Sequence, residues 1–67
     1  MPSEKERLKA KLEFLLEHSK EHVEEFEELA KKADKLGETA LRDHILQGIE
    51  HVSKANQAFE SALKKLK

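Results

Sequence analysis

The sequence predicts an all-α protein: an antiparallel two-helix hairpin that dimerises into a four-helix bundle. This prediction rests on two apolar heptad repeats, one on each side of Leu36-Gly37. A repeat of 3.5 residues keeps one stripe of a helix turned toward a packing partner. Because only about three residues separate the repeats, the second helix must fold back along the first. A chain of 67 residues is short, so residues 1–67 are expected to form a single domain.

The first helix is expected over about residues 4–36. Ser3 and Glu6 have the spacing of a capping box, in which each side chain accepts a hydrogen bond from the backbone of the other. Lys32 and Lys35 complement the negative end of the helix dipole. The heptad seam of this helix advances in steps of four and three residues and consists of Leu8, Leu12, Leu15, Ser19, His22, Phe26, Leu29, Ala33 and Leu36.

The turn is expected at residues 37–39 and the second helix over about residues 40–66. Gly37 suits the left-handed conformation that closes many helices, and Thr39 is suited to cap the next one. Gly48 costs about 1 kcal/mol relative to alanine inside a helix, so it predicts a close approach to Leu29. The second seam consists of Leu41, Ile45, Gly48, Val52, Ala55, Phe59, Ala62 and Leu66.

Two helices alone leave the outer side of their seam uncovered, so a hairpin of this size is expected to need a second copy. Further apolar residues widen one flank of each seam: Leu16, Val23 and Ala30 on the first helix, and Ile49 and Leu63 on the second. In an antiparallel pair these flanks lie on the same edge of the hairpin. We therefore predict that this edge is the surface through which a homodimer forms.

The composition argues against several classes of partner. Thirteen basic residues nearly balance fourteen acidic ones, and Tyr and Trp are absent, so neither nucleic acid nor membrane is an expected partner. No segment approaches the roughly 20 apolar residues that cross a bilayer, and the first residues lack the apolar run of a signal peptide. The chain has no cysteine, and a cytoplasmic location is expected.

An enzyme is not expected. The stretch from His18 to His22 matches the His-x-x-Glu-His pattern of one class of zinc peptidases, with Glu21 in the place of the general base. Glu21, however, falls on the outward face of the helix, and a two-helix hairpin offers no walled cleft. The match is therefore interpreted as coincidental, and no small-molecule substrate is expected.

The histidines are the main candidates for a functional site. His18 and His22 are four residues apart, so their rings project from one face of the helix. Folding the chain back brings His51 near Glu25, in a stretch where residues 17–28 hold six glutamates against one lysine. Imidazole and carboxylate groups in this arrangement are typical ligands of divalent transition metals. The sequence therefore predicts a possible Zn²⁺, Ni²⁺ or Co²⁺ site formed by His18, His22, Glu25 and His51.

An alternative interpretation gives the histidines no ligand at all. In that case three of them are solvated or hydrogen-bonded on polar helix surfaces, and His22 is buried in the seam as a neutral ring that Ser19 or a group of the partner chain can satisfy. A histidine in a seam also predicts an assembly that loosens as the pH falls, because protonation places a charge there.

Residues 17–26, Glu-His-Ser-Lys-Glu-His-Val-Glu-Glu-Phe, resemble the first helix of short, uncharacterised prokaryotic helical-hairpin proteins with a His-rich stretch of the type EHNxxHAEEFxxWA. Residues 54–63 are similar to the closing AN-x-x-L-x-x-AL segment of the same proteins. The resemblance implies a helical hairpin. This chain departs from the pattern at Phe14, where a further histidine is expected, and at Leu29, which replaces the tryptophan.

These observations predict a non-enzymatic hairpin that mediates protein–protein association with copies of itself. Divalent-metal binding through the clustered His and Glu side chains is the alternative function. Both functions use the same hairpin, so the sequence does not separate them.

Overall fold

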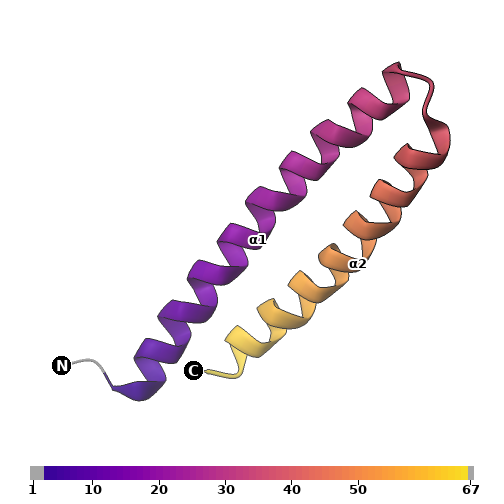
Figure 1. Cartoon of the computed structure of the whole chain (residues 1–67). Helices are drawn as coiled ribbons and strands as arrows, with labels where there is room; N and C mark the ends of the chain where they lie inside the picture. Colours follow the sequence, from indigo (N-terminus) through magenta and orange to yellow (C-terminus); the bar gives the residue numbers. More distant parts are fainter. Residues whose placement is uncertain (1–2, 67) are drawn as a thin grey trace.

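The computed structural model describes residues 3–66, so Met1, Pro2 and Lys67 of the expected domain lie outside it. Helix α1 spans Glu4–Lys35 and helix α2 spans Thr39–Lys64, and the two run antiparallel side by side (Figure 1). The described residues form no strand, and the Cα atoms extend over 53 × 18 × 10 Å. The predicted all-α helical hairpin is confirmed.

Helix α1 begins at the predicted capping box. The Ser3 hydroxyl accepts a hydrogen bond from the backbone N–H of Glu6 at 3.2 Å, and the Glu6 carboxylate accepts one from the backbone N–H of Ser3 at 3.3 Å. Two N–H groups that the helix leaves without partners are thereby satisfied. Glu4 and Glu6 in the first turn and Lys32 and Lys35 in the last turn also match the helix dipole.

The turn is a Schellman motif built on Gly37. Gly37 has φ +76°, a conformation that glycine adopts without steric cost. Its N–H donates to the carbonyl of Asp34 at 3.0 Å, and the N–H of Glu38 donates to the carbonyl of Ala33 at 2.9 Å. The expected N-cap at Thr39 is wrong by one residue. Glu38 is the N-cap residue, because its carbonyl accepts the first helical hydrogen bond, from the N–H of Arg42. Its side chain makes no capping hydrogen bond.

The helices pack along a line one position away from the centre of the predicted seam. The buried side chains are Leu16, Ala30, Ala33 and Asn56, and those half-buried include Leu12, Ser19, Val23, Ile45, Ile49, Val52 and Leu63. The flank predicted to bind a second copy therefore lies largely inside the hairpin, and this prediction is wrong. Alanines at 30 and 33 let the backbones approach closely along this line, which explains why α2 packs there.

A polar contact fixes the register near the middle of the hairpin. The Ser19 hydroxyl donates to Oδ1 of Asn56 at 2.7 Å, across the two helices. Asn56 is only 6 % exposed, and no buried side-chain N or O atom of the described residues lacks a hydrogen-bond partner. One interpretation of the sequence paired Ser19 with His22. In the structure Ser19 is paired with Asn56 instead.

Candidate functional site

The packing line divides the hairpin into two faces with different chemistry. We call the first the closed face, because ion pairs join the helices across it. Nζ of Lys20 lies 2.9 Å from Oε1 of Glu60, and Arg42 is paired with Asp34. Hydrogen bonding to Glu60, followed by its charge, raises the pKa of Lys20 above the ordinary 10.5. Hydrogen bonds to Asp34 and Asp43 likewise raise the pKa of Arg42.

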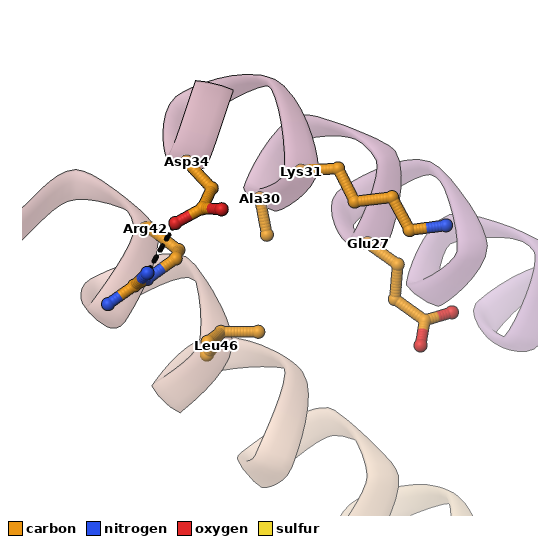
Figure 2. Close-up of a pocket in the computed structure, with 6 residues that line it drawn as sticks. All are labelled: Glu27, Ala30, Lys31, Asp34, Arg42 and Leu46. Carbon is orange, nitrogen blue, oxygen red and sulfur yellow. Dashed lines mark hydrogen bonds and ion pairs between the residues drawn. The ribbon is translucent and has the colours of Figure 1, made fainter. Parts of the chain in front are cut away.

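Figure 2 shows the closed face near the turn. The dashed line joins Arg42 of α2 to Asp34 of α1, while Ala30 and Leu46 point toward one another from the two helices. These residues line a shallow groove of about 360 Å³, together with Glu27 and Lys31. Four of the six lining residues carry charged groups, and Ala30 and Leu46 are the two apolar ones.

The second face, which we call the open face, is apolar and uncovered. Its large side chains are between 45 % and 78 % exposed and comprise Leu8, Leu15, Phe26, Leu29, Leu36, Leu41 and Phe59. Both helices contribute to it, because Phe26 of α1 and Gly48 of α2 line one groove of about 190 Å³. The apolar stripe of each helix is therefore wider than a single partner helix can cover.

Gly48 does not have the role predicted for it. A Cβ atom added at Gly48 would meet nothing within 4 Å, so the helices do not approach closely at this position. The expected packing against Leu29 is wrong, because the line of contact is rotated away from both residues toward Ile49 and Ala30. Gly48 instead leaves a depression in the open face.

His22 lies at the centre of the open face. Leu8, Leu15, His22, Leu29 and Leu36 recur every seven residues, so they lie along one side of α1 with His22 midway between the four leucines. The side chain of His22 is 51 % exposed. The heptad pattern predicts a buried seam residue here. This prediction is wrong, because the line of contact between the helices is rotated away from His22.

The rings of His18 and His22 are in direct contact. Their Nε2 atoms are 3.0 Å apart, and the ring centroids are separated by 4.4 Å with the planes at 81°. Phe14 stacks on the other side of His18, with centroids 6.1 Å apart and planes within 6°. Phe14 therefore helps to hold the ring of His18 in place.

Two glutamates lie near the Nδ1 atoms of these two rings. Oε1 of Glu25 is 3.0 Å from Nδ1 of His22, and Oε2 of Glu21 is 3.8 Å from Nδ1 of His18. Each carboxylate comes from three residues further along α1, so the helix itself sets the arrangement. From the sequence, Glu25 is predicted to be a metal ligand and Glu21 to lie on the outward face of the helix. Their positions behind the rings follow from the same i, i+3 spacing but were not predicted.

The predicted four-residue site is not brought together as a whole. His18 and His22 meet, and Glu25 contacts His22, but His51 has no hydrogen-bond or ion-pair partner among residues 3–66. Within that part of the chain, no three His, Cys, Asp or Glu side chains are grouped so that they could hold a metal ion. His51 and His44 are exposed single histidines on α2.

Neither α1 nor α2, as described, is long and apolar enough to span a membrane. Among protein families, the one described as a domain of unknown function (DUF8180) matches residues 8–66, which is nearly the whole hairpin. The chain belongs to this family. The matched region includes α1 from residue 8 onward, the turn, the whole of α2 and the histidine pair. Comparisons with curated proteins and with solved structures give no match.

Proposed function

We propose that the protein is a non-catalytic module that associates with a second copy of itself through the open face, forming a four-helix bundle. One observation carries this proposal: seven large apolar side chains are exposed on one face of the hairpin. Monomeric soluble proteins seldom expose a contiguous apolar patch larger than a few hundred Å², and larger patches mark interaction sites.

The small core of the single chain supports the same proposal. Only Leu16, Ala30, Ala33 and Asn56 are buried among the described residues. Below about 70 residues a hydrophobic core rarely stabilises a fold by more than a few kcal/mol, so an additional source of stability is needed. Cysteine is absent, so a disulfide does not supply it. Burial of the open face against a second copy does.

The size of the hairpin fits such an interface. A standard protein–protein interface buries about 800 Å² on each partner. The accessible surface of the chain is 5570 Å², and one long face of a molecule 53 Å in length offers enough of it. The charged closed face would then point to solvent, where Lys20, Glu60, Asp34 and Arg42 keep their hydration.

The spacing of the leucines supports a specific orientation. In a two-fold symmetric dimer, if residue i contacts residue j of the other copy, then j also contacts i. Antiparallel α1 helices centred on His22 would pair Leu15 with Leu29 and Leu8 with Leu36. Every leucine of this row then meets a leucine, and His22 lies beside the two-fold axis.

The resemblance to known hairpin proteins and the expected cytoplasmic location belong to the same proposal. The resemblance of residues 17–26 to the His-rich helix of short prokaryotic hairpin proteins agrees with a small helical module. The cysteine-free composition favours a cytoplasmic location for it.

Sedimentation equilibrium tests the proposal directly, because dimer formation depends on concentration. A dimer at micromolar concentration is expected, and a chain that remains monomeric at about 300 μM would refute the proposal. Cysteine cross-linking tests the orientation. The chain has no cysteine, so His22→Cys is expected to form a disulfide-linked dimer readily, while the control Leu46→Cys, on the closed face, is not. A dimer in which His22→Cys does not cross-link would reject the orientation and retain the open face.

A further inference from the structure

We infer that His18 and His22 form a two-imidazole site for a divalent transition-metal ion such as Ni²⁺, Co²⁺ or Zn²⁺. The two rings belong to one chain and already face each other, with Nε2 atoms 3.0 Å apart. Both ligands of the site therefore come from a single chain. The site differs from the four-residue site that the sequence predicted, because neither Glu25 nor His51 is a ligand.

The contacts of the Nδ1 atoms leave the Nε2 atoms available to a metal. Oε1 of Glu25 lies 3.0 Å from Nδ1 of His22 and favours a proton on that nitrogen, so the neutral ring carries its lone pair on Nε2, the atom that contacts His18. Without a metal, the N–H of His18 Nε2 can donate to this lone pair across 3.0 Å. When a metal binds, the proton of His18 moves to Nδ1, on the side where Glu21 lies 3.8 Å away. Both neutral rings then offer a lone pair at Nε2, and no net proton is released.

Carboxylates behind the rings are typical of histidine metal sites. A ligating histidine usually donates its second N–H to a carboxylate or carbonyl, which fixes the tautomer and raises the basicity of the ligand. Glu25 is placed to take this role for His22, with Oε1 3.0 Å from Nδ1, whereas Glu21 is 3.8 Å from Nδ1 of His18 and must move closer to do the same. Phe14 stacks on His18 and restricts its rotation. The pair is thus oriented by its surroundings before any ion binds.

The separation of the two nitrogens matches the bite of a metal ion. With metal–nitrogen bonds of about 2.1 Å, neighbouring ligands are about 3.0 Å apart in an octahedral complex and about 3.4 Å apart in a tetrahedral one. The observed 3.0 Å corresponds to the octahedral value. Ni²⁺ or Co²⁺ therefore requires the rings to turn so that both lone pairs point at the ion but leaves the Nε2 separation unchanged, whereas tetrahedral Zn²⁺ also requires the rings to separate slightly.

Local charge also favours a cation at this position. Residues 17–28 contain six glutamates and one lysine. That lysine, Lys20, is paired with Glu60 on the closed face, so it does not oppose an ion at the histidines. The remaining coordination positions are open to water and, in the proposed dimer, to the histidines of a second copy near the two-fold axis.

Isothermal titration of chelator-treated protein with NiCl₂ at neutral pH tests the inference. The wild-type chain is expected to show a saturable site, and His18→Asn is expected to weaken it by at least about tenfold, because one of two ligands is lost. The matched control, His44→Asn/His51→Asn, removes two exposed histidines that have no partner among residues 3–66 and is expected to retain the affinity within about twofold. Glu25→Gln is expected to weaken binding by about tenfold through the orientation of His22.

Two results would overturn the inference: no saturable binding by the wild-type chain, or the same affinity in His18→Asn as in wild type. His18 is more than half exposed, so its substitution leaves the packing intact, and circular dichroism of each variant checks this. Paramagnetic broadening of the histidine ring protons by Co²⁺ gives a second measurement: broadening confined to His18 and His22 supports the site, and broadening confined to His44 and His51 rejects it. Sedimentation of metal-free protein is measured in parallel, so a failed titration does not count against self-association.

Discussion

The open face can be tested by shortening the two leucines on either side of His22. We expect Leu15→Ala/Leu29→Ala to weaken the dimer strongly while leaving the hairpin helical. Alanine has the higher helix propensity, so the helix itself loses nothing from the change. Both leucines lie on the open face, and in the proposed orientation each meets the other across the interface.

The size of the effect follows from the exposed fraction of the side chains. Full burial of a leucine stabilises by roughly 1.5–3 kcal/mol. Leu15 and Leu29 are each 49 % exposed in the single chain. About half of that free energy, on the order of 1 kcal/mol per side chain, therefore remains to be gained on dimerisation. Two leucines in each of two copies give about 4 kcal/mol, which corresponds to a roughly thousandfold increase in the dimer Kd.

Leu46→Ala is the matched control. Leu46 is 46 % exposed, close to the value for Leu29, but it lies on the closed face beside Arg42. Sedimentation equilibrium of wild type, Leu29→Ala, Leu46→Ala and the double variant gives the Kd of each. We expect Leu29→Ala alone to raise the Kd by about 30-fold, since two copies each lose about 1 kcal/mol, and Leu46→Ala to leave it unchanged.

If Leu46→Ala weakens the dimer as much as Leu29→Ala does, the interface is not confined to the open face, and the proposal is refuted. The proposal is also refuted if the double variant dimerises like wild type. In that case the row of leucines around His22 is not in the interface.

Three further predictions concern the hairpin itself. Gly37→Ala should destabilise the fold by about 1–2 kcal/mol, because Gly37 has φ +76°; a thermal melt followed by circular dichroism measures this, and an unchanged midpoint would contradict the role of Gly37 in the turn. Ser19→Ala should cost about 1–3 kcal/mol, because it leaves Oδ1 of the buried Asn56 without its donor; a urea titration against the control Ser61→Ala, on the exposed surface, should show the difference. Lys20→Gln should lower the melting temperature slightly. The pKa of Lys20 is raised in the folded state, so the stabilisation is fully present below 10.5 and lost as the pH rises through the folded pKa; wild type and variant should therefore converge in alkaline solution, and a constant difference would argue against the ion pair with Glu60.

The sequence by itself determined the local structure. Ser3 and Glu6 form the capping box that their spacing indicates, and Gly37 closes α1 in the left-handed conformation. The proximity of His18 and His22 could also be predicted from the sequence, since it depends only on a spacing of four residues along one helix. These features involve groups within one or two helical turns, so sequence spacing alone fixes their geometry.

The tertiary structure decided which flank of each apolar stripe faces the other helix. Heptad periodicity shows that a stripe exists, but a stripe wide enough for two partners does not specify which partner each flank receives. That choice depends on contacts between residues far apart in the chain, such as Ser19 with Asn56 and Lys20 with Glu60, and on the closer approach that Ala30 and Ala33 permit. The same long-range packing turned His22 from an expected core position to the centre of the open face and, among the described residues, did not group His51 with it into a metal site.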